Sequence, residues 1–190
     1  MAEIRLRPAV PGDVPALARL HAASWRDSYR GIVADRVLDG DLETQRRELW
    51  ARLLARPAGT LHAHVAEGAD WADRADPGNG LAGFALALPL PDGALAHLAA
   101  LYVAARLRGC GIGDRLLRAI VRGLVETGVR TLSAEVYAEA GRARAFYAVR
   151  GAREGVPFDD PAEPRPDGRP VSVVPLAWDR AALHRLAEPD

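Results

Sequence analysis

The spacing of apolar residues along the chain predicts alternating helices and strands. Residues 4–7 alternate apolar and polar side chains, as a half-buried strand does. Apolar residues recur at helical spacing after a capping Asp13, in a helix that ends near Gly31, and again through 42–54. The pattern further predicts strands at 60–67, 81–90, 95–103, 129–137 and 171–178, helices at 112–125 and 142–149, and a short helix after the last strand.

Glycine, proline and aspartate mark the connections between these elements. Residues 33–40 form a looser stretch, 68–80 an acidic turn and 159–170 a loop rich in Pro and Asp. The chain shows no internal repeat and no linker. We therefore expect one mixed α/β domain built around one sheet over residues 3–180, followed by a C-terminal tail, 181–190.

The segment that carries chemistry joins a strand to an amphipathic helix. The strand ends in Leu101-Tyr102-Val103, and the turn reads Arg108-Gly109-Cys110-Gly111-Ile112-Gly113, with Asp114 following. Backbone N–H groups at a glycine-rich turn that opens a helix form a cradle for phosphate oxygens, and Arg108 adds a charged donor. The pattern favours a diphosphate-bearing ligand, although the glycines alone also fit a purely structural turn.

Two common nucleotide motifs do not fit this turn. The spacing required by the dinucleotide fingerprint G-x-G-x-x-G is missing, and the P-loop needs a lysine that this chain lacks. The hypothesis of a nucleotide-dependent or NAD-binding protein therefore depends on the glycines alone.

The turn resembles that of the GCN5-related N-acetyltransferase (GNAT) superfamily, whose motif [RQ]-x-x-G-x-[GA] follows a strand ending in L-Y-V. A later segment, Ala143-Arg144-Ala145-Phe146-Tyr147 with Gly151, is similar to that family's A-x-x-F-Y-x-x-x-G signature. The order of elements agrees over residues 3–178. The resemblance implies an α/β (α+β) GNAT fold, with one mixed, mostly antiparallel sheet of about seven strands flanked by four or five helices.

The resemblance also implies acetyl-CoA as co-substrate and an enzyme that moves its acetyl group to a primary amine. Backbone groups of Leu101 and Val103 would hold the pantetheine arm, and residues 108–113 the pyrophosphate. Tyr147 would donate a proton to the departing thiolate, because a phenol of ordinary pKa is protonated at neutral pH. The implied cofactor-binding residues are Leu101, Tyr102, Val103, Arg108, Gly109, Cys110, Gly111, Ile112, Gly113, Asp114, Ala140, Ala143 and Tyr147.

Two positions depart from the family pattern. Family members often carry Asn where Ala140 stands and Phe where Ala152 stands, so one polar contact near the cofactor arm and one aromatic core residue are missing. These departures motivate the second hypothesis, a catalytically weakened module that binds acyl-CoA as a sensor.

The base and the acceptor site have several candidates. His97 stands where relatives often have Glu, and an imidazole can accept a proton from the amine directly or through water. Glu135 on the neighbouring strand is the alternative base or a group that binds a cationic substrate. Trp25 and Tyr29 could form an aromatic wall of the acceptor site, and Tyr137 is a weaker candidate of the same kind. Core packing or exposure to solvent is the competing interpretation for each.

Composition limits the partners. The 25 basic residues, all arginine, balance 25 acidic ones, which gives no reason to expect nucleic acid or an anionic membrane. A single cysteine, Cys110, excludes an internal disulfide and indicates a reducing, cytoplasmic location; the motif places it too far from the thioester for an acetyl-cysteine. His62 and His64 share a strand face without further ligands nearby, so no metal is expected. The family often dimerises, and a homodimer remains an open expectation.

Overall fold

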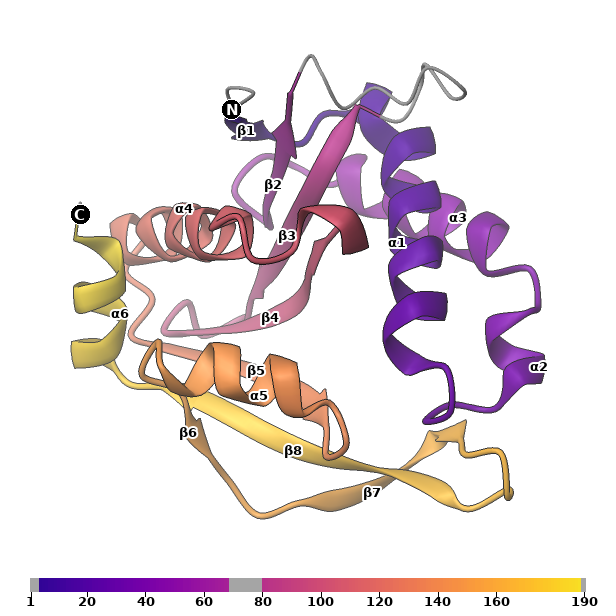
Figure 1. Cartoon of the computed structure of the whole chain (residues 1–190). Coiled ribbons are helices and arrows are strands. Elements are labelled where there is room, and N and C mark those ends of the chain that lie inside the picture. The colour runs from indigo at the N-terminus through magenta and orange to yellow at the C-terminus, as the bar shows by residue number, and fades with distance from the viewer. Residues whose placement is uncertain (1–3, 69–79, 189–190) are drawn as a thin grey trace.

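A sheet of eight strands with helices on both faces forms the centre of the molecule (Figure 1). The structure is a computed structural model, and it describes residues 4–68 and 80–188. The strands are β1 Arg5–Pro8, β2 His62–Glu67, β3 Leu81–Pro89, β4 Leu95–Val103, β5 Thr131–Tyr137, β6 Arg153–Glu154, β7 Phe158–Pro164 and β8 Pro170–Trp178. The described α-helices are α1 Val14–Tyr29, α2 Asp35–Leu38, α3 Leu42–Leu54, α4 Ile112–Glu126, α5 Gly141–Ala148 and α6 Arg180–Ala187.

The strand order is β1-β2-β3-β4-β5-β8-β6, and β7 pairs with β8 beside β6. Neighbouring strands run antiparallel except β4 and β5, which are parallel. The chain crosses between these two strands through α4. The predicted mixed, mostly antiparallel sheet is therefore confirmed.

Helices α4 and α6 cover one face of the sheet. The apolar stripe of α4 that the sequence predicted is fully buried, with Leu116, Leu117 and Ile120 at 0% exposure against the sheet and α6. Burying each such side chain contributes about 1.5–3 kcal/mol, so this stripe holds α4 in a fixed position. The opposite face is covered by α1 and α3, where Trp50 packs edge-on against Phe84.

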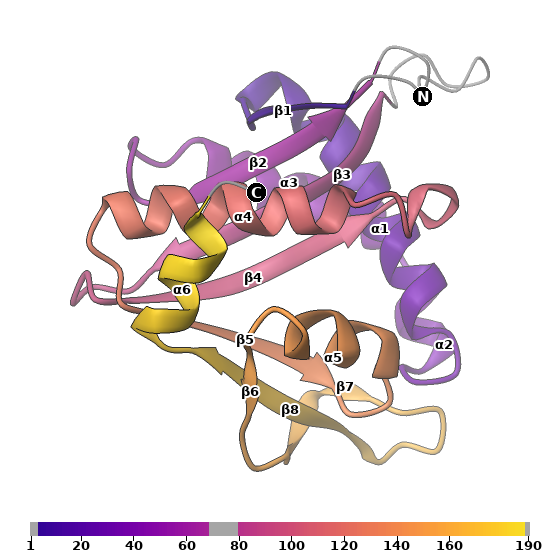
Figure 2. The same cartoon turned by 60° about the vertical axis from the view of Figure 1, so that its left-hand side comes forward.

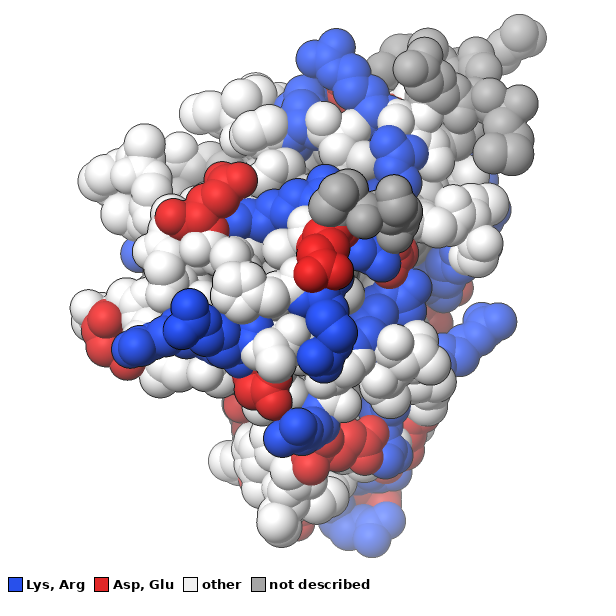
Figure 3. All heavy atoms as spheres, turned by 90° about the vertical axis from the view of Figure 1, so that its left-hand side faces the viewer, with Lys and Arg blue, Asp and Glu red and all other residues white. Residues whose placement is uncertain are grey.

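Arginines of α4 also anchor the helix through polar contacts. Arg118 and Arg122 donate to the carbonyl oxygens of Leu186 and Ala187 at the C-terminal end of α6, where helix carbonyls lack intrahelical partners. Figure 3 shows the face of the molecule on which these helices lie, with basic and acidic side chains interspersed. This face therefore carries no large region of one charge.

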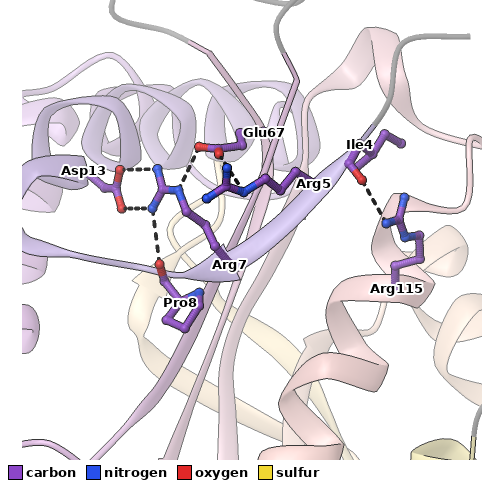
Figure 4. Close-up of polar contacts among 7 residues, drawn as sticks. All are labelled: Ile4, Arg5, Arg7, Pro8, Asp13, Glu67 and Arg115. Carbon is purple, nitrogen blue, oxygen red and sulfur yellow. Dashed lines mark hydrogen bonds and ion pairs between the residues drawn. The ribbon is translucent and has the colours of Figure 1, made fainter.

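An ion-pair cluster fixes the N-terminal strand and the start of α1 (Figure 4). Arg7 donates to Glu67 on β2 and, through two nitrogens, to both carboxylate oxygens of Asp13 at 2.7 and 2.8 Å. Burial raises the pKa of Asp13, but the hydrogen bond from Arg7 and one from the Val10 amide outweigh it, so the net pKa is lowered. Arg115 of α4 donates to the carbonyl of Ile4, which ties this end of the sheet to α4.

Strands β4 and β5 separate partway along their length (Figure 2). They pair only from Leu95 with Thr131 to Leu98 with Ala134. Just beyond, Leu98 pairs with Ala87 of β3 and Ala100 with Leu86, so Ala99 is an extra residue in β4. Such a bulge bends a strand. The remaining residues of β4 and β5 face each other without pairing, which opens the sheet between them.

The sequence prediction was wrong in one segment and incomplete in others. Residues 159–170 do not form only a loop, because β7 extends to Pro164 and pairs with β8. The prolines argued against a strand here, but among the described strands β7 pairs only with β8, and an edge strand tolerates proline. The four-residue α2 lies inside the stretch predicted to be loose. The predicted acidic turn at 68–80 lies almost entirely outside the described residues.

The C-terminal segment is part of the core. Leu183 and Leu186 of α6 are buried against α4, so most of the predicted tail packs with the domain before it. None of the helices within residues 4–68 and 80–188 is long and apolar enough to cross a membrane.

Candidate active site

A pocket of about 940 Å³ lies where β4 and β5 separate. The ends of β4 and β5, the turn before α4, helix α5 and the last turn of α1 all contribute to its wall. Most of the candidate residues from the sequence therefore meet at one place: Leu101, Tyr102, Val103, Arg108, Gly109, Gly111, Ile112, Gly113, Asp114, Ala140, Ala143, Tyr147, Tyr29 and Glu135 all line it.

The turn before α4 has the geometry of an anion site. Gly109 and Gly111 have φ of +84° and +78°, a conformation that glycine adopts without steric cost. Gly111 is the N-cap of α4, and no side chain caps the helix there, so its first N–H groups remain available. Gly113 packs closely on α5, since a Cβ at this position would lie 3.3 Å from the Phe146 ring. Cys110 is exposed and does not contribute to the described pocket wall.

Arg108 lies at the edge of the pocket and reaches α1. Its Nη1 lies 2.5 Å from the Asp27 carboxylate, and its Nε donates to the Val103 carbonyl at 3.3 Å. Asp27 and Ser28 also line the pocket, although neither residue belongs to a recognisable motif. The guanidinium thus combines a contact to β4 with one to α1.

Asp114 is engaged by two arginines. Its carboxylate accepts from Arg118 at 2.8 Å and from Arg150 at 2.7 Å, and Arg150 also stacks on the Phe146 ring at 3.8 Å. Burial raises the pKa of Asp114, but the hydrogen bonds from Arg118 and Arg150 outweigh it and the net pKa is lowered. A carboxylate held this way joins α4 to α5 and shapes the pocket between them.

Tyr147 lies on the inner side of α5. Its side chain is 7% exposed and packs edge-on against Phe146 and Trp178. Burial raises the pKa of Tyr147 well above its usual value, and the nearby Tyr29 contributes in the same direction. The phenol is therefore protonated throughout the neutral range. Ala140 is the N-cap of α5 and offers no side-chain cap, as expected from the missing Asn.

All four tyrosines of the chain gather around the pocket. The hydroxyl groups of Tyr29 and Tyr102 lie 2.9 Å apart, and the ring of Tyr137 packs edge-on against Tyr29 at 4.7 Å. Trp25 also packs edge-on against Tyr29, and the Arg46 guanidinium lies 4.2 Å from the centroid of the Trp25 ring. Tyr29 and Tyr102 line the pocket, whereas Trp25 and Tyr137 stand behind them as support.

The two candidate bases occupy different positions. Glu135 follows the last β4–β5 pair, is exposed, lines the pocket and has no ion pair with any residue that the structure describes. His97 lies in the paired part of β4, opposite Ser133, with its Nδ1 3.1 Å from the Ser133 hydroxyl. The structure does not bring His97 into the pocket wall.

Residues His62 and His64 lie under α4. A Cβ at Gly123 would lie 2.7 Å from Nδ1 of His62, so this imidazole fills the space beside a helical glycine. Burial lowers the pKa of both histidines. Within the described part of the chain, no three His, Cys, Asp or Glu side chains gather in a way that could hold a metal ion.

Sequence reasoning missed several other pocket residues. Glu139 lines the pocket and forms an ion pair with Arg165 of the β7–β8 hairpin. Arg142, at the start of α5, also lines it. Neither belongs to a motif, and a hairpin that folds back from sequence-distant strands leaves no local signal of this contact.

Comparison with known proteins places the chain in a family. A sequence profile of the acetyltransferase (GNAT) family matches residues 19–152. A search of curated proteins found no match. Among solved structures, the PaiA N-acetyltransferase of Thermoplasma acidophilum in complex with coenzyme A is 18% identical, with a TM-score of 0.72 over 93% of this chain and 99% of that one.

Two further structures are similar over nearly their whole length. Ribosomal-protein-alanine N-acetyltransferase of Brucella melitensis is 23% identical, with a TM-score of 0.66 over 92% of this chain and 99% of that one. A GCN5-related N-acetyltransferase of Kribbella flavida is 21% identical, with a TM-score of 0.67 over 93% and 97%. At these identities the likeness shows the shared fold.

Proposed function

The chain belongs to the GNAT family of acetyltransferases, and from this premise we propose that it transfers the acetyl group of acetyl-coenzyme A directly to a primary amine of a small molecule or peptide. The observation that carries the proposal is the single pocket that joins an uncapped, glycine-rich helix start to a buried phenol between two separating strands. Coenzyme A carries both a diphosphate and a long amide arm, which suit the turn before α4 and the gap between β4 and β5.

The residues present suit coenzyme A. The first N–H groups of α4 and the positive end of its dipole favour the diphosphate at residues 109–113. The pantetheine arm is an amide chain, and the unpaired edges of β4 and β5 beyond Leu98 offer it backbone donors and acceptors. Arg142 at the start of α5 adds positive charge on the same side.

The chemical step needs an acid, an oxyanion donor and a neutral amine. In the proposed ternary complex the amine attacks the acetyl carbonyl, and an N–H group of the unpaired edge of β4 stabilises the negative oxygen. Tyr147, whose buried phenol is protonated at neutral pH, donates that proton to the departing thiolate. The proton lost by the amine leaves through a base or through water.

We assign the base role to Glu135, directly or through a water molecule, because it lines the pocket and is free of ion pairs among the described residues. A carboxylate there also attracts an ammonium substrate. His97 is the less favoured base, since its imidazole lies beside Ser133 within the paired strands. Tyr29 and Tyr102, supported by Trp25 and Tyr137, form the acceptor side of the wall.

The test is release of free thiol from acetyl-CoA in the presence of an amine panel. We expect amine-dependent release from the wild-type protein. Replacing Tyr147 with Phe should lower kcat by about 100-fold or more while the melting temperature changes little, because only the hydroxyl is removed. Val149→Ala, at the C-terminal end of the same helix and outside the described pocket wall, is the control. An unchanged rate in Tyr147→Phe would reject the assigned acid.

Among the described residues, the start of α5 at Ala140, which has no side-chain cap, is a feature that favours the sensor hypothesis. A module of that kind would bind coenzyme A in calorimetry and release no thiol with any amine. Ala140→Asn restores the side chain that relatives often carry. A gain of transfer in this variant over an inactive wild-type protein would support the sensor hypothesis.

A further inference from the structure

The guanidinium of Arg108 is shared between the cofactor turn and the last turn of α1. Nη1 contacts the Asp27 carboxylate at 2.5 Å, Nη2 donates to the Ser28 hydroxyl at 3.4 Å and Nε donates to the Val103 carbonyl at 3.3 Å. Each of its three nitrogens therefore has an acceptor within the protein. Asp27 supplies the one full negative charge in this set.

The same guanidinium lies where the proposed diphosphate would bind. Arg108 immediately precedes Gly109, and Arg108, Gly109 and Asp27 all line the pocket. The other acids of the described pocket wall differ from Asp27 in their partners. Asp114 is held by two other arginines and Glu139 by Arg165, while Glu135 follows the last β4–β5 pair.

We propose that Asp27 sets the affinity for coenzyme A by competing with its diphosphate for Arg108, so that the carboxylate weakens cofactor binding and speeds release of the product coenzyme A. This inference rests on the proposed function and names a residue that the family motif does not include. Asp27 acts through Arg108 and takes no part in the chemical step.

The contact has little role in stability. The side chains of Arg108 and Asp27 are 36% and 45% exposed, and exposed ion pairs contribute little to folding. To reach Arg108 the diphosphate has to displace the Asp27 carboxylate, and breaking an exposed ion pair of this kind costs about two- to fivefold in affinity.

The experiment is calorimetric titration of coenzyme A into the wild-type protein and Asp27→Asn. We expect Asp27→Asn to lower the Kd by about two- to fivefold, more at low salt than at high salt. The KM for acetyl-CoA should fall in parallel. Asp27→Glu, which keeps the charge on a longer side chain, should return the Kd close to the wild-type value.

A matched control removes the same charge elsewhere. Asp35 lies on α2, outside the described pocket wall, and pairs with Arg30 at 2.7 Å with a side chain that is 68% exposed. Asp35→Asn should leave the Kd unchanged. In an Arg108→Gln background, where coenzyme A binds more weakly, the gain from Asp27→Asn should largely disappear.

Three results would overturn the inference: an unchanged or higher Kd in Asp27→Asn, an equal gain in Asp35→Asn, or a full gain in the Arg108→Gln background. Each of them leaves the proposed function intact, because wild-type binding and thiol release are measured separately. A wild-type protein that binds no coenzyme A would overturn the proposed function, and this inference with it.

Discussion

The conformation of Gly111 offers a direct test of the turn before α4. In Gly111→Ala the new Cβ meets no atom within 4 Å, but the residue must keep a φ of +78°. Gly93, in the turn between β3 and β4, has a φ of +68° and equally open surroundings. The pair of substitutions therefore imposes the same backbone strain at two sites, only one of which lines the pocket.

The strain should lower the stability of both variants by a small amount. An L-residue in the left-handed region costs about 1–2 kcal/mol, and replacing Gly by Ala recovers about 0.4–1 kcal/mol through the unfolded chain. Each variant should lose about 1 kcal/mol of stability, or roughly 2–4 °C in melting temperature for a chain of this size. If the strain at residue 111 tilts the N–H groups of α4, losing one charge-assisted hydrogen bond to the diphosphate costs about tenfold in affinity.

The assay combines thermal unfolding with titration of coenzyme A. We expect both variants to melt a few degrees earlier and only Gly111→Ala to bind coenzyme A about tenfold more weakly. Equal affinities in the two variants would refute the reasoning, since the turn would then hold no ligand. A loss of affinity in Gly93→Ala would show that the assay reports stability instead of binding.

Three further predictions concern stability and are measured by urea unfolding. Asp13→Asn should lose about 1–2 kcal/mol of stability at pH 7. Because the pKa of Asp13 is lowered, this difference from the wild type should vanish as the pH falls below 3.8. A stability difference that stays constant with pH would contradict this prediction. His21 of α1 is 6% exposed, and this burial lowers its pKa to about 3. The wild type should therefore lose up to about 1.4 kcal/mol of stability per pH unit below 6.5, a slope that His21→Phe should reduce. Gly83 lies on β3, and in Gly83→Ala the new Cβ would lie 2.8 Å from the Tyr102 carbonyl oxygen. The variant should lose about 2–3 kcal/mol of stability. An unchanged stability would show that β4 can move to accommodate the Cβ.

Most of the helices and strands could be predicted from the local spacing of apolar residues. The helix at 42–54 and the strand at 95–103 have the predicted bounds, because their apolar periodicity and flanking Pro, Gly and Asp residues act within one segment. The strand β7 was missed for the opposite reason. Its residues are polar and proline-rich, and it exists because the backbone of β8 pairs with it.

The residues of the candidate site likewise fall into those that a local motif reveals and those that depend on distant partners. The glycine turn and the segment around Tyr147 were found from short motifs, whose residues act together over a few positions. Asp27, Glu139 and Arg165 were not found, because their partners lie tens of residues away and the pairing depends on how α1 and the β7–β8 hairpin pack. The divergence of β4 and β5 depends on the bulge at Ala99, for which the apolar pattern gave no sign.

The measurement that bears most directly on the central claim is a crystal structure of the protein with coenzyme A. We predict that the diphosphate accepts hydrogen bonds from the N–H groups of residues 109–113, that the pantetheine arm runs between β4 and β5, and that the sulfur lies beside the Tyr147 hydroxyl. Coenzyme A bound elsewhere on the molecule, with the turn before α4 making no contact to it, would contradict the account.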